Sequence, residues 1–253
     1  MKKFIVLTFI ALFVSSCATR EEIVFFQNIE KIEDFEDLEQ FEPKIEVNDL
    51  LRIHVSSIND EVVEPFNVSF NNQLNGGGGN NMNMLGYLVD AEGNITFPVL
   101  GEVEVINKTT SELEEYLTGI LREKYVTDAV VKVRLVNFKI TVLGEVGSQG
   151  VIQVPDEQVT IPEIIALAGG ITYNGLRENI LVIRNNEGEL TYGRVDLTDA
   201  SVFEDPYFYL KQNDIVYVEP TYRRVKSAGF FSSPGSILSI ISATLSLIFI
   251  FTR

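Results

Sequence analysis

The chain has 253 residues, a formal net charge of −16 and a single cysteine. A protein this acidic is a poor candidate for nucleic-acid binding, because affinity for the phosphate backbone depends on clustered lysine and arginine. One cysteine cannot form a disulfide within the chain, so a secreted form needs another role for it. The length is sufficient for one or two compact domains, each with a buried core.

The N-terminus has the pattern of a secretory signal. Two lysines (residues 2–3) precede an uncharged and mostly apolar run over residues 4–14, which ends in Ser15, Ser16 and Cys17. The run is too short to span a bilayer, which takes about 20 helical residues. The small residues before Cys17 resemble a bacterial lipobox. We predict a signal peptide over residues 1–16 and acylation of Cys17, palmitate included; the alternative is cleavage further along the chain.

The C-terminus holds an uncharged segment rich in Ile, Leu and Phe over residues 236–252. As a helix it would reach about 25 Å at roughly 1.5 Å per residue, which suits a thin bilayer such as the bacterial outer membrane. We predict a C-terminal transmembrane helix here. Four serines form a stripe that either packs helices together or faces a water-filled lumen: Ser239, Ser242 and Ser246, with Ser236 flanking. The alternative is a plain anchor with incidental serines.

Three further segments connect these ends to the folded part. Residues 17–42 are acidic with apolar residues every third position, which fits a short helix or a lightly packed tether. Residues 71–83 include four consecutive glycines among asparagines, which predicts a loop without a packed core. A linker over residues 221–235 carries Arg223, Arg224 and Lys226, which predict a basic rim at a membrane interface.

Residues 43–137 predict a first β-rich domain. Residues 45–55 alternate around Asn48 and Asp49 as strand, turn and strand, and residues 86–98 predict a hairpin that turns at residues 92–94. Thr109, Thr110 and Ser111 can cap a helix over residues 112–124, and residues 126–135 alternate as a strand. The only histidine, His54, falls on the polar face of its strand, so we expect it to face solvent.

Residues 138–220 predict a second domain with one helix among several strands. Strands are expected over residues 140–146, 151–154, 179–184, 191–196 and 215–219. Thr160 and Pro162 begin the helix, and Gly169 and Gly170 end it. This order predicts a β-grasp-like plan, and the chain as a whole an α+β fold: a β-rich domain, the β-grasp-like domain and the C-terminal transmembrane helix.

No set of residues points to catalysis. The acidic pairs Asp90/Glu92 and Asp196/Asp199 could imitate the two carboxylates of a glycosidase, but turn or surface roles account for all four. The sequence has no cysteine–histidine cluster for zinc, and one exposed histidine cannot serve a serine–histidine–acid triad. We predict no enzyme activity, no cofactor and no metal.

The stretch YLVDAEGNITFPVLG, residues 87–101, resembles the export-domain signature of bacterial polysaccharide export outer-membrane lipoproteins. The residues that we single out in it are Tyr87, Asp90, Gly93, Phe97, Pro98 and Gly101. Residues 45–53 resemble the opening motif of that family, with Val47 and Asn48 where Pro-Gly is usual. Residues 140–220 resemble one soluble-ligand-binding β-grasp (SLBB) module, through positions that include Gly144, Gly169, Gly170 and Asp214.

The resemblance implies a ring of identical lipoprotein subunits that forms an outer-membrane channel for capsular or extracellular polysaccharide. It implies that most of the chain lies in the periplasm, that C-terminal helices form a barrel in the outer-membrane lipid, and that an inner-membrane polysaccharide co-polymerase docks beneath. The alternative is a non-channel periplasmic lipoprotein that binds a ligand or serves as a scaffold. Nucleic acid is not an expected partner.

Overall fold

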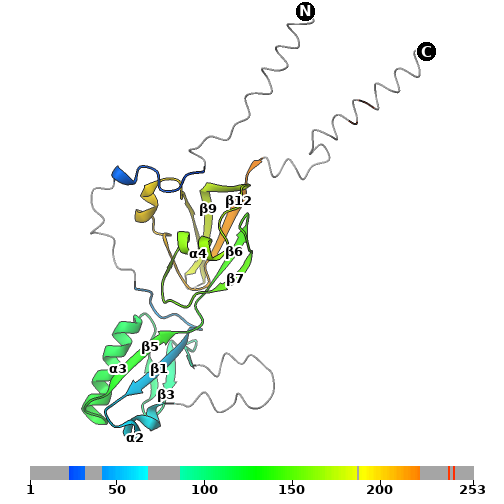
Figure 1. Cartoon of the computed structure of the whole chain (residues 1–253). Helices are drawn as coiled ribbons and strands as arrows, with labels where there is room; N and C mark the ends of the chain where they lie inside the picture. The colour runs from blue at the N-terminus through cyan, green and yellow to red at the C-terminus, as the bar shows by residue number, and fades with distance from the viewer. Residues whose placement is uncertain are drawn as a thin grey trace, which may run out of the picture.

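The computed structural model describes residues 23–31, 42–67, 86–186 and 188–222, together with Ser239 and Ser242. Two units follow one another along the chain (Figure 1). The first contains β1 (Leu50–Ser56), α2 (Asp60–Val63), the 3-10 helix η3 (Glu64–Phe66), β2 (Tyr87–Leu88), β3 (Asn94–Phe97), β4 (Gly101–Glu104), α3 (Thr110–Lys124) and β5 (Val130–Leu135). The second contains β6 (Lys139–Gly144), β7 (Gly150–Gln153), β8 (Val159–Thr160), α4 (Ile161–Leu167), β9 (Gly175–Asn186), β10 (Glu189–Val195), the 3-10 helix η6 (Ala200–Glu204), β11 (Tyr209–Leu210) and β12 (Ile215–Pro220).

The first unit is built on β1, the central strand of an antiparallel sheet in the order β2-β1-β5. Alternate residues of β1 are buried, and His54 lies on the exposed face opposite Lys132, as predicted. Helix α3 covers the sheet with Leu113, Leu117 and Leu121, all fully buried, because a spacing of four puts them on one face. The predicted helix and its N-terminal capping are confirmed, with a capping box between Thr109 and Glu112.

The outer edge of β5 is blocked by side chains of α3. The Val133 N–H donates to Glu114 Oε1 at 3.0 Å, and the Val131 N–H donates to Thr118 Oγ1 at 3.3 Å. These are the groups with which another strand would pair. The first unit therefore does not offer this edge for strand addition.

The second unit is a five-stranded mixed sheet in the order β10-β9-β12-β6-β7, in which only the β12–β6 pair is parallel. Helix α4 packs Ile161, Ile164 and Ile165 on one face of this sheet, in a core shared with inward residues of every central strand. Thr160 caps α4 in a second capping box. One helix on a mixed sheet agrees with the predicted plan for residues 138–220.

A segment that precedes both units packs on the second one. The N–H groups of Phe26 and Gln27 donate to Leu197 O and Thr198 O, and the Phe26 ring stacks on Phe203 at 5.4 Å between centroids. Residues 29–31 of this segment form the 3-10 helix η2 (Ile29–Lys31). The acidic segment beyond it, residues 32–41, lies outside the described residues.

Two predicted features of the first unit are wrong. Residues 94–97 do not pair back on residues 87–88: β3 pairs with β4 through a turn at residues 98–100, whereas β2 pairs with β1. Residues 45–47 are not a strand, because Asn48 has a φ of 70° and the chain turns there before β1 begins. In both cases the alternating pattern was present, but it does not encode which strand lies beside which.

The predicted fold class must also be corrected at the C-terminus. Among the helices of the described residues, none combines the length and apolarity needed to cross a bilayer. The longest, α3, has 15 residues, reaches only about 22 Å and carries several charges. Of the segment predicted to span, only Ser239 and Ser242 are described, as helical and exposed residues. The described residues therefore form a mixture of helices and sheets, and they do not support the C-terminal transmembrane helix that we predicted.

Gly144 provides a test of how closely the neighbouring strands β6 and β12 pack in the second unit. It has a φ of +92°, and a Cβ placed there would lie 2.0 Å from Val218 O on the neighbouring strand. We expect Gly144→Ala to cost far more than the about 1–2 kcal/mol of a left-handed backbone alone, measured by chemical denaturation. The matched control is Gly170→Ala, where φ is +81° but nothing lies within 4 Å. Equal losses for the two variants would contradict this account.

Candidate functional site

The most specific part of the export-type motif forms a turn. Asp90 Oδ1 accepts the N–H groups of Glu92 at 3.0 Å and Asn94 at 2.8 Å. Gly93 has a φ of +83°, and a Cβ there would lie 2.5 Å from Ile106 Cβ. Asp90 and Gly93 thus fix the entry into β3, and Glu92 lies on the exposed outer part of the turn.

The other four motif positions lie in the core and in the next turn. Tyr87 and Phe97 are buried with their ring centroids 5.4 Å apart. Pro98 O accepts the Leu100 N–H, and Gly101 with a φ of +79° leads into β4. The export motif is therefore a folding motif of the first unit, and its side chains do not converge on a cavity.

The glycines of the β-grasp motif bring two loops together. Ala168 O accepts the Ser148 N–H at 2.7 Å, and Gly170 O accepts the Gly147 N–H at 2.9 Å. Gly169 and Gly170 both have a φ of +81°, which ends α4 as predicted and turns these carbonyls toward the β6–β7 turn. A side chain on Gly147 would lie 2.7 Å from Gly169 O, so the contact depends on glycine.

Asp214 is the acceptor of a buried ion pair. It is fully buried and receives Arg184 Nη2 at 2.8 Å and Nε at 3.1 Å, a bidentate pair. Lys211 N–H also donates to Asp214 at 2.8 Å, and Arg184 lies over the Tyr207 ring at 4.9 Å. Sequence reasoning named Asp214 but not this role for Arg184, although an arginine at an inward position of β9 was the available signal.

Removing one partner of this ion pair should destabilise the fold more than replacing both partners. Arg184→Met leaves the Asp214 carboxylate buried without its partner, so we expect a loss of about 3–5 kcal/mol in the free energy of unfolding. Adding Asp214→Asn removes the buried charge and should recover much of that loss. Denaturant unfolding of both variants measures this, and a single variant within about 1 kcal/mol of the wild type would contradict it.

The acidic pairs weighed as glycosidase candidates have structural roles. Asp196 accepts the Thr198 N–H and hydroxyl at 2.8 and 2.6 Å. Asp199 caps η6, and the hydrogen bond from the Ser201 N–H, followed by those from the side chains of Ser201 and Asn28, lowers the pKa of its carboxyl. With Asp90 in its turn, these carboxylates are held by local backbone rather than paired across a cleft.

Several sequence-predicted sites lie outside the described residues. They are Cys17, the Asn/Gly loop over residues 71–83, the basic residues Arg223, Arg224 and Lys226, and the serines Ser236 and Ser246. Their roles stay predictions. Among the described residues there is no group of three or more metal-binding side chains.

The linker between the two units is held by one asparagine. Asn137 Oδ1 accepts the Leu50 N–H at 2.9 Å, and Asn137 Nδ2 donates to Asn48 O at 3.0 Å, both in the first unit. Its own carbonyl accepts Gln212 Nε2 of the second unit at 2.9 Å. On the other side of the junction, Glu157 accepts the Thr110 hydroxyl at 2.8 Å. The units are thus joined by hydrogen bonds as well as by the chain.

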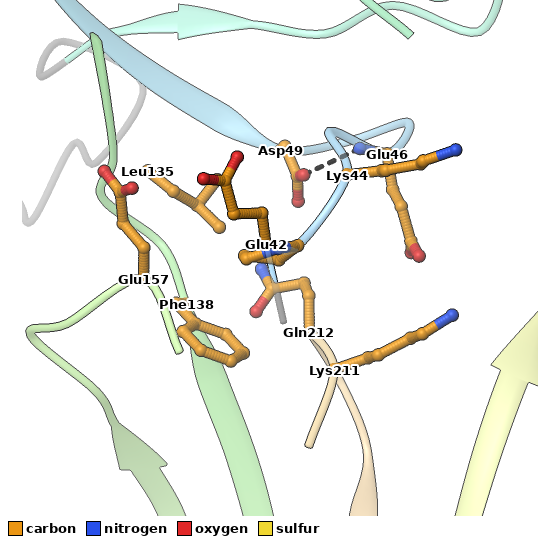
Figure 2. Close-up of a pocket in the computed structure, with 10 residues that line it drawn as sticks. Glu42, Lys44, Glu46, Asp49, Leu135, Phe138, Glu157, Lys211 and Gln212 are labelled. Carbon is orange, nitrogen blue, oxygen red and sulfur yellow. Dashed lines mark hydrogen bonds between the residues drawn. The ribbon is translucent and has the colours of Figure 1, made fainter. Parts of the chain in front are cut away.

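A pocket of about 300 Å³ lies at this junction (Figure 2). Its lining combines charged side chains of both signs, carbon-rich walls and one amide: Glu42, Glu46, Asp49 and Glu157; Lys44 and Lys211; Pro43, Leu135 and Phe138; and Gln212. The lining comes from both units and from the segment that leads into β1. Sequence reasoning missed this pocket, because it is formed by residues far apart in the chain.

Asp49 is the unusual group in this pocket. It is 2% exposed; Oδ2 accepts the Glu46 N–H at 2.8 Å, and Oδ1 has no hydrogen-bond partner among the described residues. Burial raises the pKa of this carboxyl to about 7, because removal from water disfavours its charged form; the hydrogen bond from the Glu46 N–H partly offsets this rise in pKa, and the charge of the Glu46 carboxylate adds a smaller increase. The only sequence signal was an acid next to an apolar strand.

Asp49 predicts a pH dependence of stability. Its pKa rises from 3.8 to about 7 on folding, so the folded protein holds the proton more tightly and loses stability as pH rises from about 4 to 7. Asp49→Asn removes the titrating group, so the variant does not lose stability in this way. The free energy of unfolding of the variant minus that of the wild type should therefore increase between about pH 4 and pH 7, by on the order of a few kcal/mol. A difference independent of pH, in denaturation at pH 4 to 8, would contradict the assignment.

The two units match two known families. Residues 39–136 match the family described as polysaccharide biosynthesis/export protein, and residues 138–218 match the SLBB domain. The predicted resemblance to polysaccharide export proteins, with an export domain followed by one SLBB domain, is thus confirmed for residues 39–218.

Two curated relatives have the same printed name, EPS I polysaccharide export outer membrane protein EpsA. The protein from Ralstonia solanacearum is 32% identical over 148 residues, which cover 54% of this chain and 37% of the relative. The protein from Ralstonia nicotianae is 33% identical over 140 residues, covering 53% and 35%. The match therefore spans little more than a third of the length of these relatives.

Proposed function

We propose that this protein is an outer-membrane component for export of capsular or extracellular polysaccharide, assembled as a ring of identical subunits that encloses the path. Acylation of Cys17 holds each subunit at the outer membrane, the described units lie in the periplasm, and an inner-membrane polysaccharide co-polymerase is the partner beneath. The match to the export family and the names of the two relatives support the export role. The single observation that carries the assembly is an uncovered apolar face.

This face is the side of the five-stranded sheet opposite α4. Side chains alternate across a strand, so the neighbours of the buried residues in β9, β12 and β6 point away from the core. In most sheets with one solvated face those positions are polar. Here polar residues such as Thr141, Asn179 and Asn185 alternate with a group of apolar ones, and we call the apolar group the outer apolar face: Leu143, Val151, Leu181, Ile183, Leu190, Tyr192, Ile215 and Tyr217.

None of these side chains belongs to the core cluster of its own unit. Leu190 and Tyr192 are each 72% exposed, Val151 is 62% exposed and Leu143 is 40% exposed, whereas the four residues on β9 and β12 are half-buried. A charged pair, Arg194 with Glu219 at 2.9 Å, lies beside the apolar residues. A contiguous apolar patch with a polar border is what protein interfaces present.

A ring also requires a fixed subunit shape. Head-to-tail contacts close into a ring only if each subunit turns the next by the same angle. The Asn137 hydrogen bonds and the Glu157–Thr110 bond, which both join the two units, restrict that angle. The junction therefore supports a closed assembly rather than two independently moving domains.

The second candidate function is a non-channel lipoprotein that binds a ligand or acts as a scaffold in the periplasm. The pocket between the two units favours it, since a monomeric binding protein also presents such a site. The two candidates differ in particle size. Protein extracted in mild detergent forms a discrete large particle if it is a ring, and a monomer if it is a binding lipoprotein.

A charge on the outer apolar face tests the assembly. We expect Tyr217→Lys to convert the large particle into monomers and to abolish surface polysaccharide, because an unpaired ammonium would be buried between subunits. Light scattering of the extracted protein and staining of surface polysaccharide measure the two effects. The matched control is Ile58→Lys, at a side chain that is 96% exposed in the first unit. A wild-type protein that is monomeric, or a Tyr217→Lys variant that assembles and exports normally, would overturn the proposal.

A further inference from the structure

The pocket between the two units has the chemistry of a small polar binding site. We propose that it is a subsite for one uncharged sugar unit of the exported polysaccharide, in which Asp49 accepts a hydrogen bond from a sugar hydroxyl. This inference rests on the proposed export function and names the kind of sugar that the path contacts. It concerns a site formed by both units, to which the opening motif of residues 45–53 contributes Glu46 and Asp49.

The buried carboxylate is the first step of the argument. Figure 2 shows Asp49 pointing into the pocket, with one oxygen bound to the Glu46 backbone. The other oxygen, Oδ1, is buried without a hydrogen-bond partner among the described residues. Burying an unsatisfied acceptor costs free energy, of about 1–3 kcal/mol and more when it is charged. A ligand that brings a donor to Oδ1 removes that cost, so the site favours hydroxyl or amine groups.

The remaining lining selects a hydroxyl-rich ligand. Lys44 and Lys211 offer donors, whereas Glu42 and Glu46 offer further acceptors. Each sugar hydroxyl both donates and accepts, so one sugar ring can use both kinds of partner. Pro43, Leu135 and Phe138 supply carbon-rich walls for the C–H faces of the ring. The volume of about 300 Å³ lies at the small end of ligand pockets, which suits one sugar unit rather than a long segment.

The net charge of the pocket lining determines whether neutral or anionic sugars can bind there. The lining holds the carboxylates of Glu42, Glu46 and Glu157, together with Asp49, whose raised pKa leaves it only partly charged near pH 7, against the two ammonium groups of Lys44 and Lys211. This excess of negative charge, within a chain of net charge −16, repels uronic acids and other anionic sugars. A metal ion is not favoured, because no three His, Cys, Asp or Glu side chains among the described residues, those of the pocket included, are arranged so that they could hold one. The pocket therefore fits neutral sugars.

Binding to the full-length, detergent-extracted protein tests this subsite. The probes are neutral hexasaccharides of glucose, galactose and mannose, a hexagalacturonate and a chitosan hexamer, observed by saturation-transfer NMR and titration calorimetry. We expect at least one neutral probe to bind and the galacturonate not to bind. Asp49→Asn should weaken neutral binding at least tenfold, whereas Glu61→Gln, on the exposed helix α2, should leave it unchanged.

A second variant guards against a mere folding effect. Pro43→Trp places a bulky side chain in the lining of the pocket and leaves Asp49 unchanged. It should also abolish binding, while the variant still unfolds in the same transition as the wild type. Binding of chitosan alone would make the pocket a cation site and overturn the inference, as would no binding of any neutral probe or unchanged binding in both variants. The export function is tested separately: if deletion of the gene leaves surface polysaccharide intact, the proposed function itself fails.

Discussion

The arrangement of the two units depends on the hydrogen bonds of Asn137. This residue lies in the short connection between β5 and β6, and its side chain occupies both the Leu50 N–H and Asn48 O at the start of β1. Its carbonyl binds Gln212, whose own side-chain oxygen accepts the Lys139 N–H at 2.8 Å. A linker residue with all three groups engaged cannot rotate freely, so the pocket beside it keeps its shape. The relative placement of the two units and the shape of the pocket between them therefore depend on this restraint.

The family motifs act through shape rather than through chemistry. Asp90 and Gly93 shape a turn, Gly144 permits the close approach of two strands, and Gly169 with Gly170 brings a helix end to a loop. Gly93 and Gly144 admit few residue types because the Ile106 side chain or the Val218 carbonyl lies where another Cβ would be, whereas Gly169 and Gly170 are favoured by their left-handed backbone. This explains why a short motif identifies the fold strongly while it says little about what the protein binds.

Local features of the fold were predictable from the sequence, whereas strand partners were not. Thr109 and Thr160, each followed three residues later by glutamate, placed the starts of both helices correctly, because capping is a local interaction. The partner of residues 94–97 was wrong, since an alternating pattern fits any neighbour. The predicted transmembrane helix failed for a related reason. Apolar composition indicates that a segment is compatible with lipid, but it does not establish that the segment forms a helix long enough to span a bilayer.

The candidate site was unpredictable for a different reason. Asp49 is one acid among 36 acidic residues, and nothing in its neighbours marks it as buried. It becomes distinctive only when the second unit covers it, with Phe138 and Gln212 contributed from far along the chain. For Arg184 the inward position on β9 was a sequence signal of burial, but its partner Asp214 is 30 residues away and only the fold places it beside Arg184. Long-range burial is what turns these ordinary residues into special ones.

The acidic charge of the chain constrains both the proposed assembly and the proposed transport role. An acidic protein repels an acidic glycan, which prevents tight binding along a path through which a polymer must slide. Repulsion between identical acidic subunits opposes assembly equally, so a ring needs a contact that does not depend on charge. The outer apolar face supplies such a contact on a sheet whose charged side chains Arg194 and Glu219 already neutralise one another. In the proposed assembly, a single neutral-sugar subsite would give the export path selectivity without strong retention, because one sugar unit makes few contacts and would be released as the polysaccharide advances.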